Sequence, residues 1–123
     1  MKRVDLSKLS DDALIQLFAE NTREQDKALL GGQSAKYNRL FERMVDIHDG
    51  LKARPGDQRR MLVQLFEFPN MHVRLQAAKL TLAVAPLEAR CQLQAVVDSK
   101  WFPQAGDAGV CLHNLDTGFY KPT

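Results

Sequence analysis

The stretch 71–85 constrains the fold more than any other part of the sequence, because it is apolar on two sides of a helix. Two stripes run along it at helical spacing, the first of Val73, Ala77, Leu80 and Val84 and the second of Leu75, Ala78, Leu82 and Ala85. Only a narrow strip, with His72, Gln76 and Lys79, is polar. A helix of this kind has to be sandwiched between neighbours. The pattern therefore predicts an inner helix of a helical stack, with His72 solvated in its first turn.

Start and stop signals divide the chain before this stretch into further helices. Ser10, followed by two aspartates, predicts a helix start, and Gly31-Gly32 predicts its end. Because residues 21–27 are nearly all polar, we expect this first helix to cover the core only at its two ends. Residues 34–54 repeat apolar positions every three or four residues, which predicts an amphipathic second helix.

Proline separates the remaining helices. A short third helix is expected before Pro69, and Asn70 is expected to cap the helix over 71–85. Pro86 then opens a fifth helix, and a sixth is expected to end at Gly118. The sequence thus predicts one all-α domain over residues 1–123, with terminal segments 1–9 and 117–123. We expect residues 119–122 to fold back as a cap on the last helix.

A faint internal repeat suggests how these helices are arranged. A shift of about 31 residues sets Pro55 on Pro86, Arg59 on Arg90, Leu62 on Leu93, Leu65 on Val96 and Ala77 on Ala108. This period matches one helix pair of a repeat protein, in which stacked pairs build the core together. We therefore expect a right-handed α-α superhelix of about six helices, of the HEAT/armadillo kind.

Specific stretches of sequence carry a resemblance to known families. Residues 70–80, with a Val-Arg pair followed by paired alanines, resemble the second helix of a HEAT repeat. Residues 36–44, 77–86 and 102–109 resemble a family of small bacterial proteins known as a domain of unknown function (family two-zero-one-nine). The likeness covers residues 10–123. It implies an armadillo/HEAT-like superhelical fold and no particular activity.

Composition and charge exclude several classes of protein. Seventeen basic and fifteen acidic residues give a net charge of +2 without a block of like charges, so nucleic acid is the less favoured partner. No apolar segment reaches the length of a membrane span or follows Met1 as a signal peptide would. Two cysteines, Cys91 and Cys111, are too few for a disulfide framework. A cytoplasmic location away from membranes is the resulting expectation.

No catalytic or metal-binding pattern stands out. His48, His72 and His113 form no pair with the spacing of metal ligands. Cys111 and His113 are two positions apart, so on a helix their side chains point about 200° away from each other. We expect no cofactor and no metal, and the sequence favours a protein that is not an enzyme.

Charged and aromatic residues on alternate helices are the candidates for partner binding. The second helix offers Tyr37, Arg39 and Arg43, because tyrosine and arginine are enriched at interface centres. The fourth and sixth helices offer Arg74, Lys79 and Asp107. Trp101, with Phe102, lies at a helix break, where the two rings either plug the end of the stack or contact a partner.

These observations favour a protein- or peptide-binding helical-repeat module without catalytic activity. A nucleic-acid-binding HEAT-like domain is the alternative. An immunity-type role or an unrecognised enzymatic role is a further one. The sequence leaves the partner open, as well as the choice between a monomer and a dimer.

Overall fold

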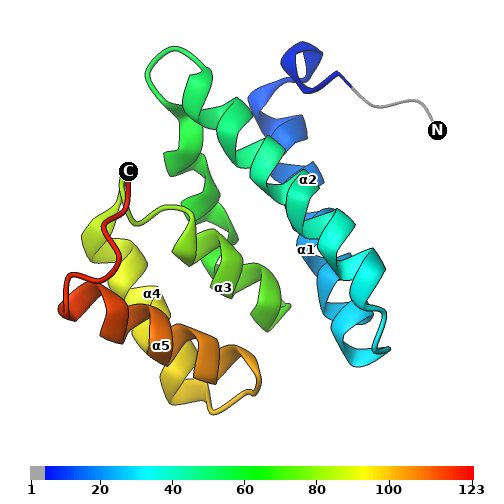
Figure 1. Cartoon of the computed structure of the whole chain (residues 1–123). Coiled ribbons are helices and arrows are strands. Elements are labelled where there is room, and N and C mark those ends of the chain that lie inside the picture. Colours follow the sequence, from blue (N-terminus) through cyan, green and yellow to red (C-terminus); the bar gives the residue numbers. More distant parts are fainter. Residues whose placement is uncertain (1–4) are drawn as a thin grey trace. The chain divides into compact units, whose positions relative to one another are not determined.

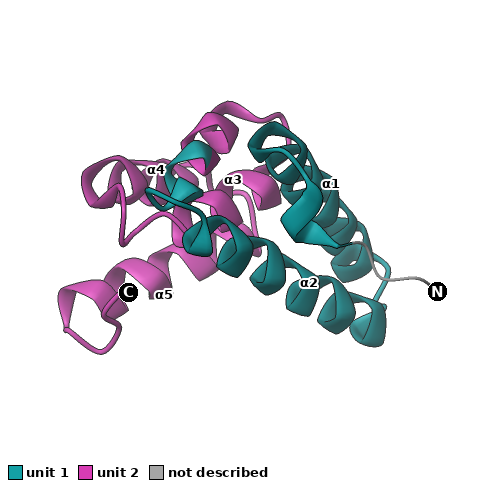
Figure 2. Cartoon of the chain, turned by 90° about the horizontal axis from the view of Figure 1, so that it is seen from above, with its two compact units in different colours: residues 1–61 teal, residues 62–123 magenta. Residues whose placement is uncertain are grey.

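Helices account for the regular structure of the chain, as the sequence predicts. In the computed structural model, which describes residues 5–123, these residues form helices and turns and contain no strand. The chain divides into two compact units, residues 1–61 and 62–123, which Figure 2 colours separately. The predicted all-α class is therefore confirmed, whereas the superhelix and the single-domain organisation stay predictions.

The first unit is a helical hairpin with a short helix before it. A 3-10 turn, η1 (Leu6–Lys8), precedes helix α1 (Asp11–Leu30), and α2 (Ser34–Ala53) follows after Gly31-Gly32. The two long helices lie side by side (Figure 1). Ser10 caps α1 as predicted, because its hydroxyl accepts a hydrogen bond of 3.1 Å from the backbone N–H of Ala13.

The polar middle of α1 is buried, so the prediction that this helix covers the core only at its ends is wrong. Asn21, Thr22 and Gln25 are all buried. The Thr22 hydroxyl donates to the carbonyl of Phe18 at 2.9 Å, and the Gln25 amide donates to Asn21 Oδ1 at 2.9 Å. Polar groups that satisfy one another or the backbone can be buried at little cost. Here the helix supplies partners one turn away for Thr22 and for the side-chain oxygen of Asn21, whereas Asn21 Nδ2 is buried without a hydrogen-bond partner among the described residues.

The expected third helix is a 3-10 helix, η2 (Gln58–Glu67). Arg59, Leu62 and Leu65 are its buried positions. They recur every three residues, which is the period of a 3-10 helix and not that of an α-helix. The spacing of the buried side chains therefore explains why this segment winds more tightly than the other helices.

A charged side-chain pair stabilises the turn before η2. Asp57 lies at a positive φ of 52° and accepts hydrogen bonds from the Arg59 guanidinium, at 2.9 Å from Nε and 2.7 Å from Nη2. The hydrogen bond from the Arg59 side chain is the main cause that lowers the pKa of Asp57 below its ordinary value. The ionised form of Asp57 is thus favoured by folding.

We therefore expect the free energy of unfolding to fall more steeply with acid in the wild type than in Asp57→Asn. A carboxylate with a lowered pKa contributes stability above its unfolded pKa, and this contribution is lost as pH falls through the folded pKa. Asparagine tolerates positive φ, so the turn itself is retained. Urea unfolding at a series of values from about pH 6 to about pH 3 measures the difference. Parallel curves for the two proteins would contradict the expectation.

The second unit holds three α-helices around one core. Helix α3 (Met71–Lys79) packs on α4 (Pro86–Ser99) and α5 (Gln104–Asp116), and the last two lie side by side (Figure 1). Asn70 caps α3 as predicted, because its side chain accepts from the N–H groups of His72 and Val73. The buried core cluster consists of Leu75, Ala78, Leu82, Ala89, Leu93, Val96, Ala108 and Cys111.

Helix α3 is shorter than predicted, because it ends at Lys79 instead of continuing to residue 85. Turns follow, and Leu82 and Ala85 in them are still buried. The Thr81 hydroxyl donates to the carbonyls of Ala77 and Ala78, at 2.9 and 3.1 Å, and so satisfies two carbonyls of the last helical turn. The apolar pattern therefore continues through a segment that is no longer helical.

Candidate binding pocket

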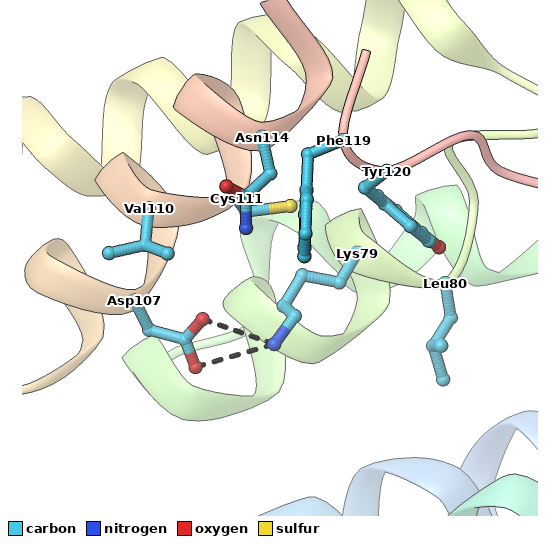
Figure 3. A pocket seen from close by; sticks show the side chains of 8 residues that line it. All are labelled: Lys79, Leu80, Asp107, Val110, Cys111, Asn114, Phe119 and Tyr120. Carbon is cyan, nitrogen blue, oxygen red and sulfur yellow. Dashed lines mark hydrogen bonds and ion pairs between the residues drawn. The ribbon is translucent and has the colours of Figure 1, made fainter. Parts of the chain in front are cut away.

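The C-terminal tail folds back on the second unit and forms one wall of a pocket. Gly118, at a φ of +77°, reverses the chain after α5, and the backbone N–H of Tyr120 donates to the carbonyl of Asn114 at 3.1 Å. The predicted return of the tail onto the last helix is therefore confirmed. It brings Phe119 and Tyr120 beside the ends of α3 and α5 (Figure 3).

The pocket encloses about 370 Å³ within the second unit. Three parts of the chain line it: Lys79 and Leu80 at the end of α3, Asp107, Val110, Cys111 and Asn114 on α5, and Phe119 and Tyr120 in the tail. Most of these side chains present carbon atoms to the space (Figure 3). A pocket with mainly apolar walls and few polar groups is the usual form of a ligand or anchor site.

An ion pair provides the polar side of the pocket. Lys79 Nζ lies 3.1 Å from Asp107 Oδ1 and 3.4 Å from Oδ2, and the two side chains are 30% and 42% exposed (Figure 3). A partly exposed pair of this kind contributes little to folding. Each charge is therefore available to a binding partner at small cost, and together the two charges cancel.

The thiol of Cys111 lies at the pocket but is poorly suited to act as a nucleophile. The side chain is buried, and burial raises its pKa above the ordinary thiol value. A raised pKa lowers the thiolate fraction, which is the reactive form. Cys91, in contrast, is exposed on α4.

We expect iodoacetamide to alkylate Cys91 at least about ten times faster than Cys111 in the folded protein. Exposure favours the first cysteine, and both burial and the raised pKa protect the second. Mass spectrometry of the two cysteine-containing peptides over time gives both rates. The same reaction in urea is the control, in which the difference should disappear. Equal rates in the folded protein would show that the pocket opens freely to the reagent.

Two predicted binding residues meet at this pocket. Lys79 and Asp107, separated by 28 positions, were expected on different helices and form the ion pair described above. Arg74 does not contribute, because its guanidinium donates to the backbone carbonyl of Phe68 within its own unit. Tyr37, Arg39 and Arg43 lie on α2 in the first unit. Trp101 lies in the second unit, at the break between α4 and α5, outside the pocket.

The expectation for His72 is wrong. His72 is buried rather than solvated, with its Nδ1 at 3.2 Å from the Gln104 amide and its Nε2 at 3.5 Å from the Gln76 amide. Two of the three residues in the polar strip of α3, His72 and Gln76, are therefore buried, and their side chains contact each other. Of the two alternatives for Trp101 and Phe102, the exposure of both rings argues against a plug, and contact with a partner stays a prediction.

The residues that sequence reasoning missed are the apolar ones. Val110 is 61% exposed and Phe119 is 82% exposed, although both line the pocket. Val110 follows Asp107 by three positions, and this spacing places it on the same face of α5. That spacing was a usable signal. For Phe119 and Tyr120, the predicted return of the tail indicated a place on the last helix, but it did not indicate a pocket shared with the end of α3.

A second pocket of the second unit is larger, at about 440 Å³, but polar side chains such as Glu67 and Gln92 contribute much of its lining. A shallow pocket of about 150 Å³ lies at the hairpin turn of the first unit, beside Gly32 and Tyr37. Within residues 5–123, no three histidine, cysteine, aspartate or glutamate side chains are grouped so as to hold a metal ion. Nor does any helix in this range have the length and hydropathy needed to cross a membrane.

Comparisons with known proteins agree with the predicted resemblance. The family described as "Domain of unknown function (DUF2019)" matches residues 12–116. The crystal structure of the protein RPA1889 from Rhodopseudomonas palustris CGA009 is similar, with 62% sequence identity and a TM-score of 0.96 over 98% of this chain and 100% of that one. No curated protein matches the chain.

Proposed function

We propose that this chain, which belongs to the DUF2019 family, is a protein- or peptide-binding module without catalytic activity. The pocket between α3, α5 and the tail receives an apolar side chain of the partner. The observation that carries the proposal is the exposure of Val110 and Phe119 on the walls of a largely apolar pocket. Exposed apolar side chains around a concavity are typical of sites that bury an anchor residue.

The polar groups of the pocket support binding rather than catalysis. Catalysis by a thiol needs a thiolate and a neighbouring base. The burial of Cys111 disfavours its thiolate, and the pocket contains no histidine. The ion pair of Lys79 and Asp107 serves instead to orient a partner segment through hydrogen bonds at the rim.

The same ion pair disfavours nucleic acid as the ligand of this pocket. Binding to phosphates requires several cationic side chains that neutralise them. Lys79 is the cation of the pocket, and the carboxylate of Asp107 already balances its charge at 3.1 Å. A protein segment with an apolar anchor fits this combination better.

Site-specific photo-crosslinking tests the proposal. A photoreactive phenylalanine derivative replaces Val110 in one variant and Leu30 in the control, because Leu30 is 81% exposed but lies in the first unit. After irradiation in cells, we expect a discrete protein adduct with the probe at position 110 and none with the probe at position 30. Mass spectrometry then identifies the adduct. No adduct at 110, an adduct with nucleic acid, or the same adducts at both positions would overturn the proposal.

A further inference from the structure

We infer that the partner at this pocket is a second copy of the same chain, whose Phe119 enters the pocket while its own pocket receives Phe119 of the first copy. The inference rests on the proposed function, because it names the partner of the same site. It is carried by the charge pattern, by the position of Phe119 and by the size of the pocket.

The charged patch at the pocket of one copy is complementary to the same patch of a second copy. In a dimer with two-fold symmetry, the same patch of both copies meets across the axis. A patch with charges of one sign would then repel itself. The patch here holds one ammonium and one carboxylate 3.1 Å apart, both partly exposed. A two-fold axis beside this pair brings Lys79 of each copy to Asp107 of the other, which gives four alternating charges.

Phe119 is placed to be inserted into another molecule. Its ring is 82% exposed although it lines the pocket, so its own chain covers little of it. The positive φ of Gly118 and the hydrogen bond from Tyr120 to Asn114 hold the tail at the pocket edge (Figure 3). Burying an exposed phenylalanine side chain favours association, because it removes apolar surface from water. In the dimer, the Phe119 ring of each copy is covered by the pocket of the other copy.

The volume of the pocket matches this occupant. An apolar cavity of about 150 Å³ is enough to bind benzene. The pocket here, with about 370 Å³, therefore has room for a phenyl ring and neighbouring atoms of the tail. Its walls of Val110, Leu80 and Tyr120 are apolar or aromatic, as a phenylalanine side chain requires.

The dimer should be weak. Stable interfaces bury about 1,200–2,000 Å² in total, and contacts below this range are usually transient. One pocket and one inserted ring per copy belong to the lower end. We therefore expect an equilibrium between monomer and dimer that depends on protein concentration.

Sedimentation velocity on the full chain is the first test. Between about 10 μM and about 1 mM, the mass should rise from 13.9 kDa towards twice that value. Phe119→Asp should remain monomeric over the whole series. Leu30→Asp is the matched control, since it places the same charge at an equally exposed apolar position of the first unit, and it should dimerise like the wild type.

A charge exchange between two variants is the decisive test. Lys79→Glu alone places two acids in the patch, and Asp107→Lys alone places two cations there, so each variant should be monomeric. Mixed in equal amounts, the two should associate at least about tenfold more tightly than either does with itself. An effect on folding cannot explain this result, because each chain is the same alone and in the mixture.

Two outcomes would overturn the inference. One is a wild type that remains at 13.9 kDa at the highest concentration. The other is a mixture of the two charge variants that associates no better than its components. If a different protein is nevertheless crosslinked at position 110, the proposed binding function stands and only the identity of the partner is wrong.

Discussion

Phe18→Ala is expected to lower the free energy of unfolding by about 3–5 kcal/mol, whereas Phe119→Ala should change it by less than about 0.5 kcal/mol. The two substitutions remove the same ring from opposite environments. Phe18 is fully buried on α1, and its loss leaves a cavity. Phe119 is 82% exposed, so its removal uncovers little.

Urea unfolding followed by circular dichroism measures both effects. Protein concentrations of about 1 μM keep self-association at Phe119 from contributing. Because both variants carry the same chemical change, any common effect of losing a phenyl ring from the unfolded chain cancels in the comparison. Similar losses in the two variants would show that the tail packs far more tightly than its exposure indicates.

Helix starts could be predicted from sequence because capping is local. Ser10 and Asn70 lie outside the helices that they cap and bond to N–H groups two or three residues ahead. The end of α3 could not be predicted in the same way. No glycine or proline marks position 80. Thr81 bonds back to Ala77 and Ala78, but Thr22 makes the same two hydrogen bonds in the middle of α1, so this pattern does not mark a helix end in the sequence.

Buried polar residues were the main source of error. The sequence pattern treats Asn21, Gln25, His72 and Gln76 as solvent-facing, but all four are buried. Each pair is separated by four positions, so the two side chains meet on one helix face. Such spacing of amides and imidazoles is a signal that can be read in a sequence. A hydropathy pattern alone cannot distinguish it from a solvated face.

The candidate site was predicted only in part, because a sequence pattern describes single helices and the site depends on how several segments pack. Lys79 and Asp107 stood out individually as polar residues on otherwise apolar helices. Their pairing across 28 positions, and the pocket beside them, depend on how α3, α5 and the tail pack. Periodicity indicates which face of a helix is buried, but it does not indicate which residues of two helices are neighbours.

Arg54→Ala is expected to lower the free energy of unfolding by about 2–4 kcal/mol, a large effect for a charged side chain. Arg54 joins three segments of the first unit. Its guanidinium donates to the carbonyls of Leu6 and Leu9, at 3.1 and 2.6 Å, and to Asp11 Oδ1 at 2.7 Å. It thereby ties the end of α2 to η1 and to the start of α1, where two carbonyls would otherwise lose a charged donor.

Two further variants separate these hydrogen bonds from the charge. Arg54→Lys keeps the charge, but an ammonium cannot reproduce the planar set of donors, so most of the loss should remain. Arg23→Ala, at an exposed position of α1, should cost less than about 0.5 kcal/mol. Urea unfolding measures the free energy of unfolding of all three variants, Arg54→Ala, Arg54→Lys and Arg23→Ala. If Arg54→Lys were as stable as the wild type, the ion pair with the half-exposed Asp11 would be the dominant contribution. The two carbonyl contacts, to Leu6 and Leu9, would then contribute little to the stability of the first unit.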